Sequence, residues 1–354
     1  MRLRKVLVSA LMLFMSPFLL LNAKSRDWEE DFRLKDIWEF PEEKLGSYIY
    51  DSDISPNGDV IFIGFKWWIV RVNKKGVSLL APKGEGPGEL RSPFNFFIKD
   101  DLIGAAETYG KISFFKIKKN SYEFQNSIFL KPSLQIRTSV FECGGKFYVG
   151  GFLPAPPRTL AKGYFLTIYG KSGKPLNKTL FLDFKKNSRI YLSRTFIRRH
   201  KDRLFVVLEF SPTIYWLNCG EEEIRGKIGL KMPDFYIPMR NLPPPPEGII
   251  SKRRLQEIYE SWEGSYSRIE QIAMDGNYMI LQIRTLKKPK FALLFYDLKD
   301  FSLSKVYLVD DRLLGVKNGT FYFFANGNPG FDEEAGEIKI KIYEKKVHEK
   351  NRSD

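Results

Sequence analysis

The chain has 354 residues, of which 43% are hydrophobic and 15% aromatic, and it carries a formal net charge of +15 at pH 7. This composition excludes an intrinsically disordered protein, and the length allows one large β domain or two ordinary domains. The two cysteines are too few for a disulfide-built scaffold, and the many Phe, Tyr and Trp residues favour β-structure.

The N-terminus has the layout of a secretory signal peptide. Three basic residues precede an apolar run from Val6 to Leu21, and Ala23 lies just before a charged stretch. We therefore predict export, with removal of residues 1–23. The alternative is an uncleaved anchor helix, although Pro17 interrupts a run of marginal spanning length. No cysteine precedes Cys143, which excludes lipid attachment at the cleavage point.

The mature chain would carry 54 Lys and Arg residues against 42 Asp and Glu residues, a net charge of +12. A basic exported protein meets anionic surfaces such as acidic glycans far more often than it meets nucleic acid. We therefore predict a periplasmic or extracellular protein with no nucleic-acid partner and no stable membrane span after cleavage. The alternative is that the dispersed charges serve solubility alone.

From residue 48 onward, short aromatic or β-branched runs alternate with turn pairs such as Asn57-Gly58 and Asn318-Gly319. Such pairs supply the positive φ angles of two-residue hairpins. The residues that open the apolar run after the first turn of each unit are Asp59, Leu102, Lys146, Arg203, Asn277 and Thr320. Their spacings are 43, 44, 57, 74 and 43 residues, and the two long spacings contain insertions, at 152–162 and 231–265. A unit of this length is typical of a four-stranded propeller blade.

Six such units over residues 33–345 predict an all-β fold, a six-bladed β-propeller of four-stranded antiparallel blades. The sixth unit has only three strands before a charged tail, residues 346–354. We expect Arg33–Phe40 to supply the missing outer strand and thereby close the ring.

The insertion 231–265 lies between blades four and five and contains the stiff spacer Pro243–Pro246. Apolar residues then recur at helical spacing over Ser251–Trp262, which predicts a helix. The helix either packs its apolar side on the ring or serves as a lid or docking arm.

The stretch Lys83–Leu90, KGEGPGEL, is the most glycine-rich in the chain. No Gly-Lys-Ser/Thr follows it, so it does not match a phosphate loop. We interpret it as the crossover from blade one to blade two, with Glu85 and Glu89 capping backbone amides. Its Gly84–Glu89 segment resembles the G-x-GPGE signature of bacterial exported six-bladed β-propeller proteins, which are relatives of the NHL-repeat propellers. The resemblance implies the fold and export rather than a chemistry.

Metal catalysis has little support in the sequence. His200 and His348 are the only histidines, which excludes a three-histidine zinc site within one chain. An all-oxygen calcium site remains open in the acidic segment 326–337, where a solvated turn is the alternative. Its candidate ligands are Asn328, Asp332, Glu333 and Glu334. We predict no cofactor.

Nucleophilic catalysis is equally unsupported, because the chain has no G-x-S-x-G elbow and neither cysteine has a nearby base. The strand assignment puts Cys143 at the end of an innermost strand and Cys219 at the end of a third strand of the next blade. We therefore expect two free thiols at different radii.

In a four-stranded blade, the turns between second and third strands and the blade crossovers emerge on one face of the ring. This rule puts the long segments on one face, the long-loop face, and the short turns on the other, the short-turn face. The candidate ligand-binding residues on the long-loop face are Arg158, Arg284, Lys287, Lys288, Tyr109 and Glu209. They suit a partner protein or an anionic glycan, so we predict a binding module. The alternative is a lyase or hydrolase at the channel mouth, with calcium as a candidate cofactor.

Overall fold

A computed structural model describes most of the blades. The described residues are 25–40, 49–64, 69–108, 110–118, 121–131, 136–154, 162–183, 194–238, 264–286, 289–325 and 338–346. The predicted signal segment 1–23, the predicted helix within 251–262, residues 347–354 of the tail and the acidic segment 326–337 all lie outside these residues. Within them, no helix has the length and apolar character needed to cross a bilayer.

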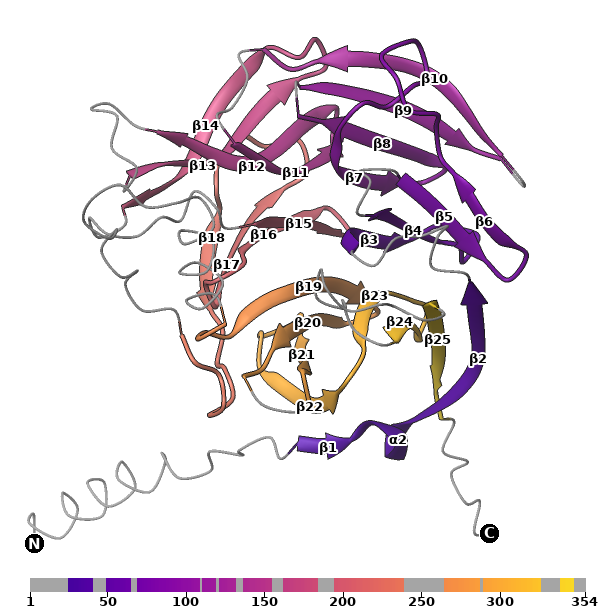
Figure 1. The fold of residues 1–354 in the computed structure, drawn as a ribbon. Coiled ribbons are helices and arrows are strands. Elements are labelled where there is room, and N and C mark those ends of the chain that lie inside the picture. The colour runs from indigo at the N-terminus through magenta and orange to yellow at the C-terminus, as the bar shows by residue number, and fades with distance from the viewer. Residues whose placement is uncertain are drawn as a thin grey trace, which may run out of the picture.

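The fold is an all-β, six-bladed propeller of four-stranded antiparallel blades, as the sequence predicts. Six sheets stand around a common axis, and the first strand of each blade is innermost (Figure 1). The innermost strands contact one another around the whole ring. The axis is therefore bounded by six strands from six different parts of the chain.

Each blade follows the chain in order from the axis outward. Blade one contains β3 (Ile49–Ile54), β4 (Val60–Gly64), β5 (Ile69–Asn73) and β6 (Gly76–Leu79). Blade two contains β7 (Pro93–Lys99), β8 (Leu102–Glu107), β9 (Lys111–Ile117) and β10 (Tyr122–Phe129). Blade three contains β11 (Ile136–Cys143), β12 (Lys146–Pro154), β13 (Lys162–Gly170) and β14 (Pro175–Asp183).

The second half of the ring repeats this order. Blade four contains β15 (Thr195–His200), β16 (Arg203–Leu208), β17 (Thr213–Asn218) and β18 (Gly226–Gly229). Blade five contains β19 (Arg268–Asp275), β20 (Tyr278–Arg284), β21 (Phe291–Asp297) and β22 (Leu303–Val309). Blade six contains β23 (Arg312–Lys317), β24 (Thr320–Ala325), β25 (Ile338–Lys345) and β2 (Phe32–Phe40).

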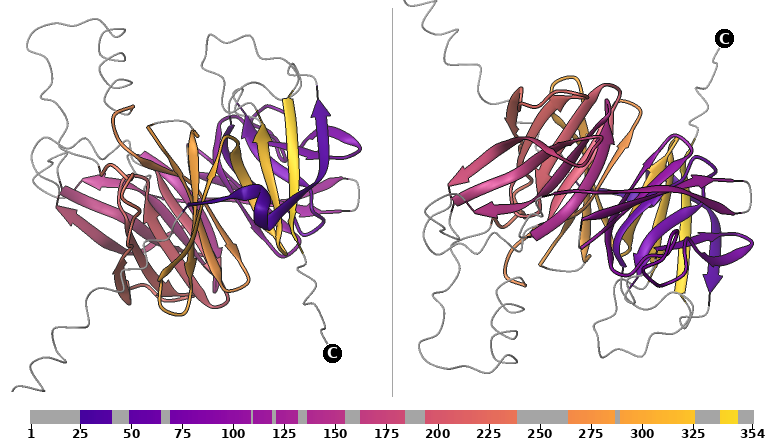
Figure 2. Two further views of the ribbon diagram at one scale, coloured as in Figure 1. Left: turned by 90° about the horizontal axis from the view of Figure 1, so that it is seen from below. Right: turned by 90° about the horizontal axis from the view of Figure 1, so that it is seen from above.

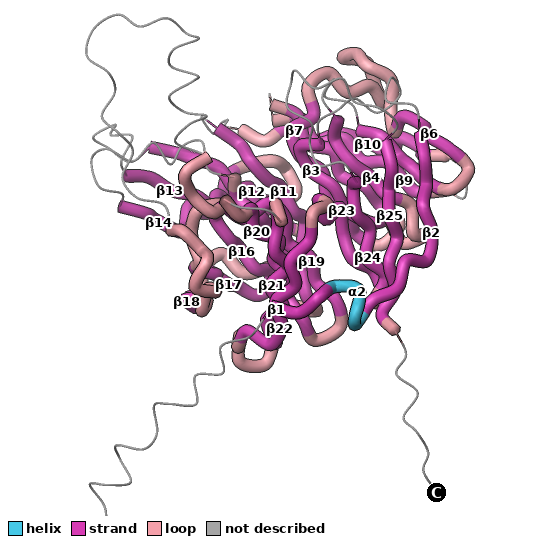
Figure 3. Tube along the Cα trace, turned by 60° about the horizontal axis from the view of Figure 1, so that its bottom comes forward, coloured by secondary structure: helices cyan, strands magenta, loops and turns pink. Residues whose placement is uncertain are grey.

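The N-terminal segment runs along two blades. β1 (Ser25–Asp27) adds to blade five as a fifth strand, parallel to β22, which the sequence did not predict. β2 pairs antiparallel with β25, so segments from the two ends of the chain lie side by side (Figure 2). The short helix α2 (Trp28–Asp31) joins β1 to β2 (Figure 3). Trp28 stacks on Phe32 and meets Tyr307 edge-on, which anchors this segment between blades five and six.

Continuous apolar runs explain the core. Every residue of β4 is buried, because this strand is covered on both faces by neighbouring blades. The buried side chains form clusters that cross from blade to blade; one of them joins Ile61 and Ile63 of blade one to Phe96 and Phe115 of blade two. The blades therefore hold one another through apolar contact rather than through an enclosed central core.

The glycine-rich stretch lies between β6 and β7, which makes it the crossover from blade one to blade two. The amide of Gly86 donates to the Glu89 carboxylate at 2.8 Å, so the predicted cap by Glu89 is confirmed. Glu85 instead forms an ion pair with Arg91. Gly88 has a φ of 77° and lies against Phe124, where a Cβ would fall 3.2 Å from that side chain.

The prediction of two free thiols is wrong, because Cys143 and Cys219 form a disulfide with a Cα–Cα distance of 5.2 Å. The loop after β17 contacts blade three, which brings Cys219 next to the end of β11. Tyr148 donates its hydroxyl to the carbonyl of Glu221 in this loop. Gly144 and Gly220 approach so closely that a Cβ on Gly144 would fall 2.7 Å from the Gly220 backbone.

Candidate functional site

The topology defines what lies at each end of the axis. Innermost strands begin at the long-loop face and end at the short-turn face, and second strands run in the opposite direction. The starts of β15, β19 and β23 therefore share one end of the axis with the ends of β16 and β20. The last residues of all six innermost strands gather at the other end.

A buried ion cluster occupies the long-loop end. The Nε atoms of Arg268 and Arg284 each lie 2.7 Å from Oε1 of Glu270, whose side chain is 4% exposed. Arg268 also approaches Glu209, with 3.9 Å between Nη1 and Oε1. Arg194 adds its charge close by and donates its backbone amide to Glu209 at 2.9 Å.

Arg312 also acts on Glu270. Four guanidinium groups thus surround Glu209 and Glu270. Burial alone would raise the pKa of Glu270, but the four arginines hold it well below its usual range. Burial raises the pKa of Glu209, and Arg194 and Arg268 only partly oppose this rise. The cluster therefore gathers four guanidinium groups at a water-poor position.

Two of the six predicted binding residues, Arg284 and Glu209, can be placed in the structure. Both belong to this cluster and are joined through Arg268 and Glu270. Arg284 is the more exposed member, with 36% of its side chain accessible. The other four lie outside the described residues: Arg158, Lys287, Lys288 and Tyr109.

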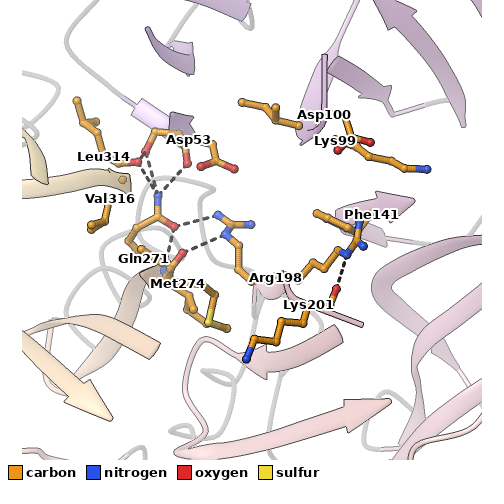
Figure 4. Close-up of a pocket in the computed structure, with 16 residues that line it drawn as sticks. Asp53, Lys99, Asp100, Phe141, Arg198, Lys201, Gln271, Met274, Leu314 and Val316 are labelled. Carbon is orange, nitrogen blue, oxygen red and sulfur yellow. Dashed lines mark hydrogen bonds between the residues drawn. The ribbon is translucent and has the colours of Figure 1, made fainter. Parts of the chain in front are cut away.

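A cavity of about 420 Å³ opens at the short-turn end, lined by residues from all six innermost strands (Figure 4). Phe141 lies on one side and Val316 on the other, while Lys99, Asp100 and Lys201 surround the opening (Figure 4). This volume falls within the usual range for small-molecule sites, about 300 to 1,000 Å³.

Beneath the cavity, a hydrogen-bond network links the innermost strands. Gln271 donates to the carbonyls of Ser52 and Leu314 and accepts from Arg198 Nη2 at 3.0 Å. Arg198 also lies 3.5 Å from Asp51, and Asp51 accepts from Asn95 at 2.5 Å. The network therefore reaches from blade two around the axis to blade six.

Backbone bulges orient this network. In five of the six blades the pairing between the first and second strands shifts register near the start of the first strand. β15 is the exception, with a continuous register. The residues that follow the shifts are Asp51, Asn95, Ser139, Gln271 and Gly315. A bulge inserts one residue and redirects the side chains after it, so Asn95, Ser139 and Gln271 become buried near the axis and Asp51 becomes partly buried.

The sequence pattern did not indicate Asp53, Arg198 and Gln271 as site residues. Arg198 belongs to β15, which continues to His200, and the turn begins at Lys201. A usable signal existed, because charged or amide side chains are unusual within strands that are buried on both faces. The bulge that buries Gln271 near the axis leaves no clear mark in the sequence.

The described residues contain no group of three or more His, Cys, Asp or Glu side chains that could hold a metal ion. The predicted calcium ligands lie outside these residues, so the calcium hypothesis stays a prediction. Within the described part, the site can offer hydrogen-bond donors, carboxylates and fixed positive charge.

No protein-family model and no curated protein matches the sequence. The solved structures that are similar in fold include two from Bacteroides. A member of the DUF4221 family from Bacteroides vulgatus aligns with a TM-score of 0.62 and 14% identity, covering 90% of this chain and 99% of that one. A Bacteroides fragilis protein, provisionally described as exported, aligns with a TM-score of 0.59 and 13% identity, covering 92% and 98%. At these identities the likeness shows the propeller fold alone, and the NHL-repeat resemblance stays a prediction.

Proposed function

We propose that the protein is an exported binding module that recognises an anionic glycan at the long-loop end of its axis. The observation that carries this proposal is the gathering of four arginines around Glu209 and Glu270. An anionic ligand would be attracted to these guanidinium groups where screening by water is weak.

The depth of the cluster favours a glycan over a flat protein surface. Arg268 is only 14% exposed and Arg284 36% exposed, so their guanidinium groups are recessed. A single carboxylate or sulfate on a flexible chain can reach such groups, and a planar guanidinium binds either anion with paired hydrogen bonds. An acidic loop of a partner protein is the alternative ligand.

Three features support export. The first residues have the layout of a signal peptide. The Cys143–Cys219 disulfide is typical of an oxidising compartment. One solved structure of the same fold is provisionally described as an exported protein. A periplasmic or extracellular location remains part of the proposal.

The ligand can be tested by titrating the protein with heparin, polygalacturonate and poly-L-glutamate at low and high salt. We expect a polysaccharide to bind and the binding to weaken as salt rises. Arg284→Gln should weaken it roughly tenfold, because one charge-assisted contact is lost. Arg33→Gln is the matched control, since Arg33 is also paired with a carboxylate but lies on β2, away from the cluster.

Binding of poly-L-glutamate alone would replace the glycan with an acidic protein segment. Equal loss of binding in the Arg284→Gln and Arg33→Gln variants would remove the cluster from the proposal, since general surface charge would then explain the affinity. Failure of all three polyanions to bind at low salt would contradict an anionic ligand.

A further inference from the structure

The cavity at the short-turn end has an ordered donor in its wall. Arg198 Nε donates to the carbonyl of Ile272 and Nη1 donates to the carbonyl of Ile197, while Nη2 meets Gln271 and Asp51. These contacts use four of the five N–H groups of a guanidinium. One N–H on Nη1 has no partner among the described residues, and the group reaches toward the middle of the cavity (Figure 4).

Asp53 supplies an acceptor to the same cavity from β3 (Figure 4). One of its carboxylate oxygens accepts the backbone amide of Ile54 at 2.8 Å. The described residues provide no other hydrogen bond to this carboxylate. Burial raises the pKa of Asp53, and the neighbouring Arg198 and Lys317 only partly oppose the rise. A carboxyl group in this state can accept from a hydroxyl group when ionised and donate to one when protonated.

The charges beside the cavity favour an uncharged ligand. Arg198 is already balanced by Asp51 at 3.5 Å, and Lys99 is paired with Glu142. A ligand carboxylate placed against Arg198 would therefore meet little net positive charge, whereas a hydroxyl oxygen needs only the open N–H. The cations at the opening, Arg199 and Lys201, are exposed, so water and salt screen them.

Part of the remaining wall is apolar. Ile98, Phe141 and Val316 line it together with the side chain of Met274. A sugar ring has hydroxyl groups around its edge and C–H groups on its faces, so it matches a cavity with polar groups at one part of its wall and apolar groups at another. The cavity volume of about 420 Å³ leaves room for a small saccharide.

We propose that this cavity is a second binding site, specific for an uncharged saccharide unit that hydrogen-bonds to Asp53 and Arg198. It lies at the opposite end of the axis from the arginine cluster and does not depend on the proposed function. The two sites share no residue. A saccharide bound here would enter from the short-turn face.

The test titrates the protein with D-glucose, D-galactose, D-mannose and N-acetyl-D-glucosamine, and with D-glucuronate and L-alanine as charged comparators. Binding is followed by calorimetry and by chemical shifts of the protein. We expect at least one neutral sugar to bind with a dissociation constant of about 1 mM or tighter. Asp53→Asn should weaken this binding about tenfold, because the carboxylate is lost while the side-chain volume is kept.

Asp36→Asn is the matched control. Asp36 also accepts the amide of the following residue, but it lies on β2 at the outer edge of blade six. Its substitution should change sugar binding by less than about twofold. Three results would overturn the proposal: no neutral sugar binds at about 10 mM, Asp53→Asn binds as tightly as the native protein, or D-glucuronate or L-alanine binds more tightly than every neutral sugar.

Discussion

Glu270 and Gln271 are consecutive residues of β19, yet they belong to different ends of the axis. Glu270 joins two arginines in the ion cluster, whereas Gln271 joins uncharged groups and Arg198 beneath the cavity. A register shift between Ile269 and Gln271 turns the side chains of Glu270 and Gln271 toward different ends of the axis. One extra residue in a strand thus divides a charged end from a nearly neutral one, and the two ends should respond differently to substitution.

The largest effect is expected at the charged end. Glu270→Ala leaves the surrounding arginines without their most buried carboxylate, so the free energy of unfolding should fall by about 3 to 5 kcal/mol. Urea denaturation measures this change. Glu344→Ala is the control, because Glu344 also meets two cations, Arg33 and Lys35, but on the exposed edge. If Glu344→Ala were as unstable as Glu270→Ala, burial of the carboxylate would not explain the large effect at Glu270.

The disulfide links blades three and four at the short-turn face. Its loss should have the second largest effect on the free energy of unfolding. Replacing both Cys143 and Cys219 by Ala releases a closed loop with a sequence separation of 76 residues. The free energy of unfolding should fall by about 2 to 4 kcal/mol, because the unfolded chain gains freedom. A reducing agent should lower the stability of the native protein to a similar degree. Two reactive thiols in the unreduced native protein would contradict the disulfide.

A smaller loss is expected at the neutral end. Gln271→Leu leaves the carbonyls of Ser52 and Leu314 without one donor and leaves Arg198 without one acceptor. We expect a fall of about 1 to 3 kcal/mol in the free energy of unfolding, measured alongside Glu270→Ala. If Gln271→Leu were the more destabilising of the two, the contrast between the ends would be wrong.

The charged end should also make the stability of the protein depend on pH. The pKa of Glu209 is raised above its ordinary value of 4.5, so the folded protein takes up this proton more readily than the unfolded chain. Its contribution to stability is present below pH 4.5 and is lost as the pH rises through the folded pKa. Relative to Glu209→Gln, the native protein should therefore become less stable as the pH rises from 4.5 to 8. A difference that grows in the opposite direction would contradict the raised pKa.

The sequence predicts the blade number well, because turn pairs and apolar runs recur at near-constant spacing. It also placed Arg284 and Glu209 at one end of the axis, since the ends of second strands follow from the strand order. The sequence does not predict the disulfide between Cys143 and Cys219, because the path of the loop after β17 depends on contacts such as the hydrogen bond from Tyr148 to Glu221. The sequence does not predict the cavity residues, because bulges break the simple alternation of side chains along the innermost strands.

The central claim is that an anionic ligand binds at the charged end of the axis. The most direct measurement is a titration of the native protein, Arg284→Gln and Asp53→Asn with heparin at low ionic strength. The account predicts weaker heparin binding in Arg284→Gln and native affinity in Asp53→Asn. Unchanged heparin binding in Arg284→Gln, or an equal loss in both variants, would contradict it.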